Sequence, residues 1–152
     1  MSVSAAKTIP TLAIADIADA DVAAVIALWQ ACGLTRPWND PASDIALARR
    51  GPHSTILIGR DTGAMVATAM VGHDGHRGWV YYVAADPERR GKGYGRAIMN
   101  AAEDWLCAAG IAKLQLLVRR ENAKAGAFYQ SIGYEEQPTI VFARWLDGRT
   151  AT

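Results

Sequence analysis

The sequence predicts an α/β fold (α+β) in which a mixed, mostly antiparallel sheet is flanked by helices. Three consecutive apolar runs, separated only by short polar joints, predict an antiparallel meander. A helical pattern then separates the third run from a further apolar run, and such a crossover makes the two flanking strands parallel. The chain has 152 residues, the size of one domain. We therefore expect a single domain over residues 11–147, after a flexible N-terminus over residues 1–10.

The first half of the chain supplies one strand, two helices and the meander. Residues 11–15 predict the first strand, and the amphipathic pattern from Asp19 to Gly33 predicts a helix that Asp19 caps and Gly33 ends. Residues 43–50 predict a short second helix. The meander is expected in three segments, residues 54–59, 63–71 and 79–84, with a hairpin between the first two because Asp and Gly lie in the joint.

The second half alternates helices with strands. After a glycine-rich loop, a helix is expected from about Ala97 to Gly110, followed by a strand over residues 113–118. Asn122 then caps a helix that ends at Gly133. The sheet is expected to finish with an antiparallel pair, residues 134–136 and 140–145.

The loop before the first of these helices, Arg89 to Arg96, reads RRGKGYGR. Its alternate glycines let the backbone approach a ligand without Cβ atoms in the way, and the following helix start offers unpaired N–H groups. Four basic side chains add positive charge: Arg89, Arg90, Lys92 and Arg96. The letters differ from both the dinucleotide fingerprint and the Walker A loop. We therefore expect an anion site for a pyrophosphate.

Two motifs together indicate a family. Arg90-x-x-Gly93-x-Gly95 resembles the R/Q-x-x-G-x-G/A loop of the GNAT superfamily of N-acetyltransferases, which binds the pyrophosphate of acetyl-CoA. The segment Asn122-x-x-Ala125-x-x-Phe128-Tyr129-x-x-x-Gly133-Tyr134 resembles the family's N-x-x-A-x-x-L/F-Y-x-x-x-G-F/Y pattern. The two motifs span roughly residues 79–136 in the expected order. Residues 34–41 and 74–78 also resemble YpeA-type members.

The resemblance implies a GNAT-like sheet of six to seven strands, with a splayed parallel pair at its centre that holds acetyl-CoA. The pantetheine arm would pair with backbone groups near Val83 and Ala85 as an added strand would, and the pyrophosphate would meet the loop. Asn122 would add a contact to the pantetheine arm. The full set expected to hold acetyl-CoA is Val83, Ala85, Arg90, Gly91, Lys92, Gly93, Gly95, Arg96, Asn122 and Phe128.

The same resemblance makes Tyr129 the general acid. A tyrosine hydroxyl has an ordinary pKa near 10, so it can donate a proton to the leaving thiolate. Helical spacing alone would make Tyr129 a core aromatic residue. The general base is less well marked, because residues 79–84 lack the glutamate that some members place there. Tyr81 or Tyr82 with an ordered water is the preferred hypothesis, and Asp86 or Glu88 would serve only if the loop turned them inward.

We thus expect an enzyme that moves an acetyl group from acetyl-CoA directly to a primary amine, through a ternary complex. The acceptor stays open among a protein N-terminus, a lysine and a small-molecule amine. Trp38, Trp79 and Tyr81 are candidate walls of its pocket, since aromatic faces attract cationic amines. The alternative is a non-catalytic acetyl-CoA-binding sensor or partner-binding module, which the retention of Tyr129 disfavours.

Composition excludes several other classes. A formal net charge of +1 with 51% hydrophobic residues indicates no nucleic-acid or membrane partner. No apolar run approaches the length of a membrane span, and no signal peptide is visible, which favours the cytoplasm. Cys32 and Cys107 lack metal-site spacing and are expected to be buried free thiols, so no metal is expected. The exposed ends of the last two strands would support a homodimer.

Overall fold

A mixed five-stranded sheet in the order β1-β2-β3-β4-β5 organises the first part of the molecule. The computed structural model describes residues 8–150, so most of the expected flexible start lies outside the described residues. These residues form two compact units that divide after Leu117. In chain order, the elements of the first unit are β1 (Ala13–Asp16), η1 (Asp19–Asp21), α1 (Val22–Ala31), α2 (Pro41–Ala48), β2 (Ser54–Asp61), β3 (Ala64–His73), β4 (Gly78–Ala85), η2 (Pro87–Arg89), α3 (Tyr94–Ala108) and β5 (Leu114–Gln115).

The expected meander is confirmed. β2 pairs with β3 and β3 with β4, both antiparallel, and β1 adds to the outer edge of β2. Thr62 and Gly63 form the β2–β3 turn with φ of 49° and 86°, the paired left-handed conformation of a tight hairpin. β4 and β5 are parallel, as the strand–helix–strand crossover predicts.

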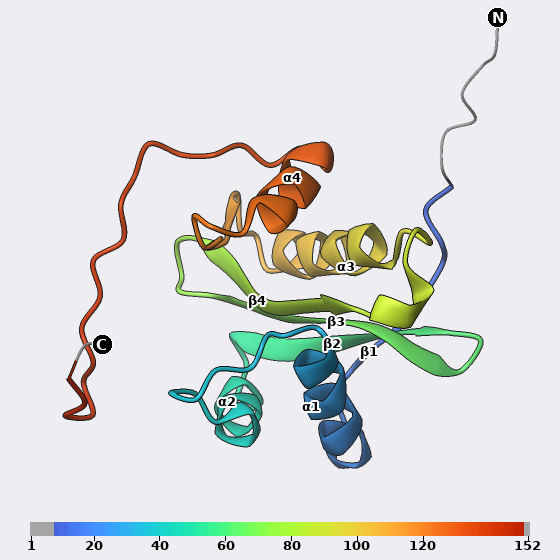
Figure 1. The fold of residues 1–152 in the computed structure, drawn as a ribbon, viewed down its shortest axis with the longest axis horizontal. Coiled ribbons are helices and arrows are strands. Elements are labelled where there is room, and N and C mark those ends of the chain that lie inside the picture. Colours follow the sequence, from blue (N-terminus) through green and yellow to red (C-terminus); the bar gives the residue numbers. More distant parts are fainter. Residues whose placement is uncertain (1–7, 151–152) are drawn as a thin grey trace, which may run out of the picture. The chain divides into compact units, whose positions relative to one another are not determined.

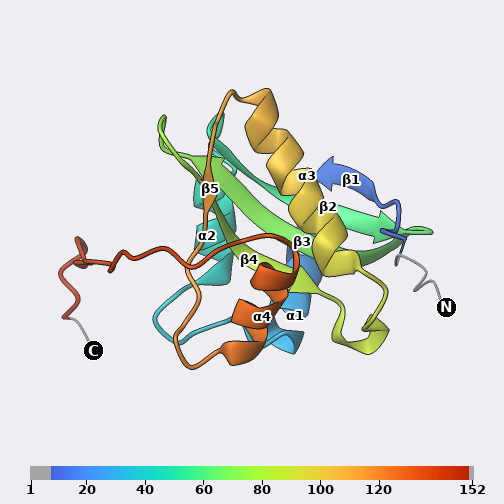
Figure 2. The same cartoon turned by 90° about the horizontal axis from the view of Figure 1, so that it is seen from above.

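Helices cover both faces of this sheet (Figure 1). α1 and α2 lie against one face, where Trp29, Ile45, Ile56 and Ile58 are almost completely buried in one cluster. α3 crosses the opposite face (Figure 2). It buries Ile98, Met99, Ala102 and Leu106 there. The apolar stripe of α3 and the alternation in the strands therefore give the sheet two apolar layers.

The second unit contains α4 (Ala123–Ser131) and an extended segment that follows it. Asn122 caps α4 as predicted, because its Oδ1 accepts a hydrogen bond from the Ala125 N–H at 3.1 Å. The expected final strands, residues 134–136 and 140–145, are wrong: the described residues after α4 contain no strand, and the sheet has five strands rather than six to seven. β-propensity measures how side chains fit a half-buried pleated surface. Among the described residues this apolar segment pairs with no strand, and Phe142 is 89% exposed.

Three local predictions also need correction. α3 begins at Tyr94 rather than near Ala97, because Gly93 in a left-handed conformation serves as its N-cap. Asp19 does not cap α1, because its carboxylate pairs with Arg49 at 2.7 Å. The N-cap residue of α1 is Asp21, which makes no side-chain cap and accepts the backbone N–H of Ala18. Cys107 is exposed rather than buried, since it follows Leu106 on α3 and so turns away from the sheet.

Candidate active site

β4 changes course at Tyr82. The register places Thr68 opposite Ala84 and Met70 opposite Tyr81, so β4 has one more residue than β3 in this interval. Tyr82 is the extra residue, and its φ of 51° is unusual for an aromatic side chain. This arrangement is a β-bulge, which bends a strand and disrupts its ladder locally.

Buried contacts fix the bulge. The Tyr82 ring stacks on Trp29 with centroids 3.8 Å apart. The Trp29 indole donates to Thr68 Oγ1 at 2.9 Å, and Thr68 in turn donates to the Tyr82 carbonyl oxygen at 3.2 Å. The Tyr82 hydroxyl donates to Asp44 Oδ2 at 2.6 Å. α1, α2 and β3 therefore each hold the strained residue.

Beyond the bulge, one edge of β4 is open. The parallel pairing with β5 covers only Gly78 and Trp79, and no other strand of the described residues continues it. The N–H of Asp86 donates to the Val66 carbonyl, on the β3 side. Because successive residues of a strand direct their backbone groups to alternate edges, Val83 and Ala85 present theirs toward the open edge. The Ala85 carbonyl oxygen there accepts a hydrogen bond from the Cys32 thiol at 3.2 Å.

The glycine-rich loop follows this edge directly. Gly91 and Gly93 both have φ of 78°, a conformation that favours glycine. A Cβ added at Gly91 would meet nothing within 4 Å, whereas one at Gly93 would lie 3.0 Å from Pro10. Gly93 offers no capping side chain, so the first N–H groups of α3 are left for a ligand. Gly95 and Arg96 lie in this first turn.

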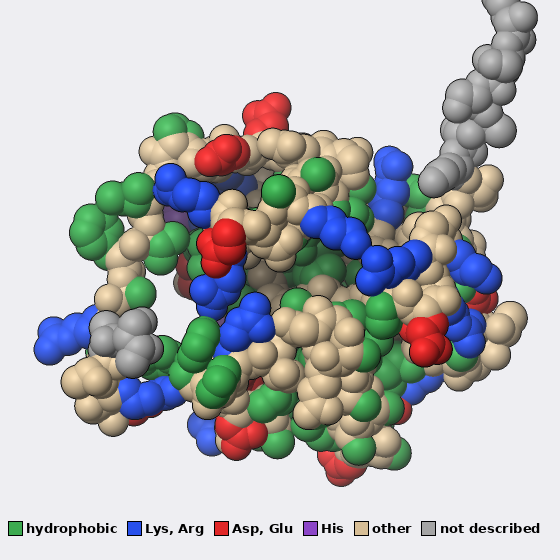
Figure 3. All heavy atoms as spheres, viewed as in Figure 1, with side chains coloured by type: hydrophobic (Ala, Val, Ile, Leu, Met, Phe, Trp, Pro, Cys, Tyr) green, Lys and Arg blue, Asp and Glu red, His purple; other side chains and the backbone are tan. Residues whose placement is uncertain are grey.

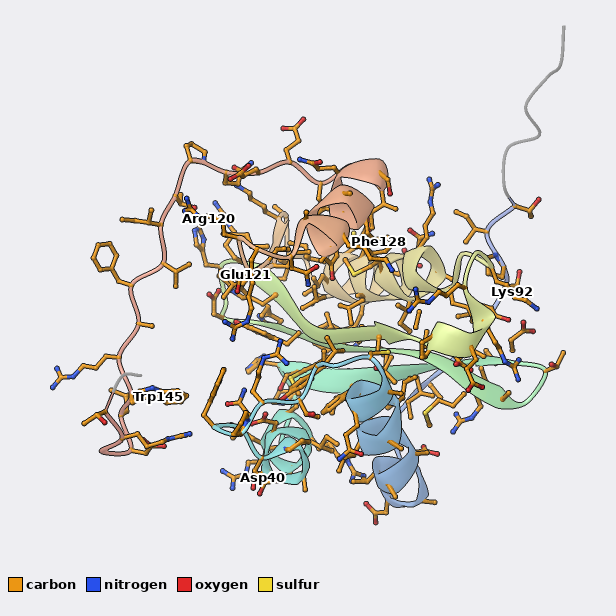
Figure 4. All side chains as sticks on the ribbon, viewed as in Figure 1. Asp40, Lys92, Arg120, Glu121, Phe128 and Trp145 are labelled. Atoms are coloured by element: carbon orange, nitrogen blue, oxygen red, sulfur yellow. The ribbon has the colours of Figure 1, made fainter. Side chains whose placement is uncertain are left out.

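Tyr94 anchors the helix start. Its side chain is buried, and its hydroxyl donates to Asp61 at the end of β2. Among the described residues, the exposed side chains of Arg90, Lys92 and Arg96 form no ion pair. Arg89 lies 3.5 Å from Asp86. Figure 3 shows basic side chains at this end of the first unit, and Lys92 extends from the loop in Figure 4.

The remaining predicted residues lie in the second unit. Asn122 precedes α4, and Phe128 and Tyr129 lie within it; Figure 4 shows Phe128 on this helix. The Tyr129 ring makes edge contacts with Phe128 and Tyr134, at centroid distances of 5.0 and 6.0 Å. Burial raises the pKa of the Tyr129 hydroxyl above its ordinary value, so the group keeps its proton at neutral pH.

Comparison with known proteins identifies the chain. The model of the acetyltransferase (GNAT) family matches residues 22–134. The chain belongs to this family. Acetyltransferase YE1169 of Yersinia enterocolitica is 39% identical over 126 residues, which cover 83% of this chain and 89% of that protein.

Solved structures share the fold. The ribosomal-protein-S18-alanine N-acetyltransferase from Escherichia coli superposes with a TM-score of 0.68 at 25% identity, over 84% of this chain and 79% of that one. AAC(6')-Iy in complex with a CoA-containing bisubstrate analogue gives a TM-score of 0.75 at 16% identity, over 90% and 99% of the two chains. The mixed α/β architecture is thus the fold of GNAT acetyltransferases.

In this GNAT acetyltransferase, two of the residues considered as the general base, Tyr82 and Asp86, already make hydrogen bonds to other protein groups. The Tyr82 hydroxyl donates to Asp44, and its pKa is raised far above the ordinary value, first by burial and then by that carboxylate. Asp86 accepts the Glu88 N–H, and its other oxygen lies near Arg89. Tyr81 is 47% exposed, and burial raises its pKa as well. Tyr82 is therefore unsuited as a base, whereas Tyr81 and Glu88 stay candidates.

The acceptor-pocket candidates are spread out along the chain. Trp38 is 41% exposed in the segment between α1 and α2. The Trp79 indole donates to Asp74 Oδ2 at 3.2 Å, so it braces the β3–β4 turn. Across the described residues, no group of three His, Cys, Asp or Glu side chains is placed to bind a metal, and no helix is long and apolar enough to cross a membrane.

Three contributors escaped the sequence reasoning: Thr68, Asp44 and Tyr94. Thr68 and Asp44 act on Tyr82 from other elements, and nothing in a single sequence marks such long-range partners. Tyr94 did carry a signal. An aromatic residue between two glycines in a basic loop has no solvent role, which indicates an anchor.

Proposed function

We propose that this acetyltransferase binds acetyl-CoA along the open edge of β4 and the loop before α3, and transfers its acetyl group directly to a primary amine. One observation carries the proposal. The bulge at Tyr82 is followed by an unpaired strand edge, and that edge runs into a glycine-rich helix start surrounded by exposed basic side chains.

The loop has the features that a diphosphate needs. Gly91 leaves open space where a ligand could approach the backbone, and the uncapped first turn of α3 offers N–H donors. The flexible side chains of Arg90, Lys92 and Arg96 add positive charge and can form hydrogen bonds to the phosphate oxygens. Gly93 and Gly95 complete the glycine pattern, with Gly93 also packed closely against Pro10.

The edge of β4 suits the pantetheine arm. The two amides of pantetheine need alternating hydrogen-bond donors and acceptors. The backbone groups of Val83 and Ala85 supply them, so that the arm pairs with β4 as an added strand would. Asn122 uses Oδ1 to cap α4, which leaves its side-chain NH₂ to donate to the arm. Phe128 supplies an apolar contact.

Acetyl-CoA supplies an activated thioester. The amine nitrogen attacks the carbonyl carbon, the C–S bond breaks, and the sulfur leaves with its electron pair. Tyr129 O–H donates a proton to that sulfur, and the proton lost by the amine passes to a water held by Tyr81 and then to solvent. Burial of Tyr129 favours the protonated form that this step requires.

The acceptor must present a neutral amine. At pH 7.4 about a quarter of an α-amine of pKa near 7.8 is neutral, against roughly 0.1% of a lysine of pKa 10.4. Proteins of similar fold act on ribosomal protein S18 alanine or on aminoglycosides, as their names state. We infer a primary-amine acceptor, either a protein or a small molecule.

Gly91→Ala tests the phosphate site. We expect the Kd of CoA, measured by calorimetry, to rise at least about tenfold, which is about 1.4 kcal/mol. Gly63→Ala is the matched control, because Gly63 also has a left-handed φ (86°) and open space around its Cβ position. Both substitutions impose similar backbone strain. Equal CoA affinity in the two variants would refute the site.

Tyr129→Phe tests the chemistry. We expect kcat to fall by about 10²–10⁴-fold with CoA affinity unchanged, because only proton donation is lost. Tyr134→Phe removes a hydroxyl from the neighbouring ring and serves as the control. Release of CoA thiol is measured with a panel of amines. If the wild type binds CoA tightly but no amine stimulates release, the non-catalytic binding module is the better reading.

A further inference from the structure

The loop before α3 has little stiffness of its own. Gly91, Gly93 and Gly95 alternate in it, and glycine loses more conformational freedom on folding than any other residue. A ligand that had to order such a loop would bind less tightly, because the ordering costs free energy that is subtracted from the binding free energy. The contacts that hold the loop in shape before a ligand arrives therefore bear directly on affinity.

At the β4 end, the Asp86 carboxylate holds the loop. Its Oδ1 accepts the Glu88 N–H at 3.0 Å, and its Oδ2 lies 3.5 Å from Arg89 Nε. The Arg89 N–H also donates to the Asp86 carbonyl oxygen at 3.1 Å. The Arg89 side chain is thus used within the loop and its flanking residues.

At the α3 end, the loop is held from β2. The Tyr94 side chain is 3% exposed, and its hydroxyl donates to Oδ2 of Asp61, the last residue of β2. This hydrogen bond raises the pKa of the Tyr94 hydroxyl, and the nearby Arg89 guanidinium opposes part of that effect. A chain of side chains, Asp61, Tyr94, Arg89 and Asp86, therefore links the ends of β2 and β4, which lie at the same end of the sheet (Figure 1).

The charge of Asp61 opposes an anion site nearby. Its carboxylate is half-buried and, among the described residues, forms no ion pair. At roughly 10 Å in water, repulsion from one carboxylate lowers the affinity for each phosphate charge about twofold. Coulomb repulsion and the hydrogen bond to Tyr94 thus predict opposite effects of Asp61 on phosphate binding.

We propose that Asp61 is a positioning residue for acetyl-CoA. It acts through Tyr94, which it holds so that the first N–H groups of α3 and the glycine-rich loop are ready to meet the diphosphate. A hydrogen bond to an ionised carboxylate is stronger than one between neutral groups, so its contribution exceeds the cost of the repulsion. The proposal rests on the function proposed above and extends the phosphate site to the β2–β3 hairpin.

Calorimetry with CoA at low salt tests the proposal. We expect Asp61→Ala and Tyr94→Phe each to raise the Kd about fivefold, because either change removes the same hydrogen bond. For that reason the double variant should bind no more weakly than the weaker single variant. Asp16→Ala is the control for net charge: it removes an exposed carboxylate of β1 that lies opposite Leu57 rather than at the hairpin, and it should keep the wild-type Kd.

Asp61→Asn separates the charge from the hydrogen bond. The amide oxygen still accepts from Tyr94 while the repulsion is gone, so we expect a Kd within about twofold of the wild type. A Kd as high as in Asp61→Ala would overturn the proposal, as would an unchanged or lower Kd in Asp61→Ala or Tyr94→Phe. Thermal unfolding of each variant establishes that it is folded at the titration temperature. A wild type without affinity for CoA would instead refute the proposed function itself.

Discussion

At the scale of single residues, the Thr68 hydroxyl serves two partners. It accepts from the Trp29 indole and donates to the Tyr82 carbonyl, and Thr68 is fully buried. Thr68→Val keeps the shape but leaves a buried N–H unsatisfied, so we expect the free energy of unfolding to fall by about 1–3 kcal/mol in denaturant titrations. Thr55→Val, at a half-buried position of β2, should cost less. Equal costs would show that the hydroxyl does not hold the bulge.

Tyr129 gives a second residue-scale prediction, in the pH profile. A general acid works while protonated, so activity is lost only as pH rises through its pKa. The ordinary pKa is about 10 and burial raises it. We therefore expect kcat at saturating substrates to show no decline from Tyr129 up to about pH 10. A basic limb centred below about pH 9 that disappears in Tyr129→Phe would contradict this assignment.

At the scale of elements, Asp74 closes the turn between β3 and β4. Its carboxylate accepts hydrogen bonds from the N–H groups of Arg77 and His76 and from the Trp79 indole, and these bonds lower its pKa to about 2 from 3.8. A lowered pKa stabilises the fold above pH 3.8, and this contribution is lost as pH falls through about 2. We expect Asp74→Asn to lower the thermal midpoint at pH 7, with the difference from wild type shrinking below pH 3.8. A constant difference across the acid range would exclude the linkage.

The elements also show how far local signals reach. Periodicity and turn residues located the meander, the crossover helix and the Asn122 cap, because each depends on residues close in sequence. The glycine and basic residues of the loop were likewise visible. The bulge was not, since Trp29, Asp44 and Thr68 reach Tyr82 from three other elements. The last two strands failed because strand composition does not reveal whether a neighbouring strand is present.

At the scale of the whole molecule, the two units should differ in local stability. β2 and β3 contain several fully buried core side chains and β4 buries Val80 and Ala84, whereas α4 has no buried residue. Amide exchange in α4 should therefore proceed by local opening, at a lower free energy than exchange in the central strands.

Binding of acetyl-CoA should reduce the difference in amide exchange between α4 and the central strands if Asn122 and Tyr129 contact the ligand. A ligand that binds only the ordered state stabilises it in proportion to its concentration over Kd, so saturating CoA should slow exchange in α4 as well as in the loop before α3. In Gly91→Ala, the same CoA concentration should slow both segments less, while Gly63→Ala should match the wild type. If CoA slowed exchange in the loop but left α4 unchanged, the loop would still bind the diphosphate, but Tyr129 would lose its place beside the thioester.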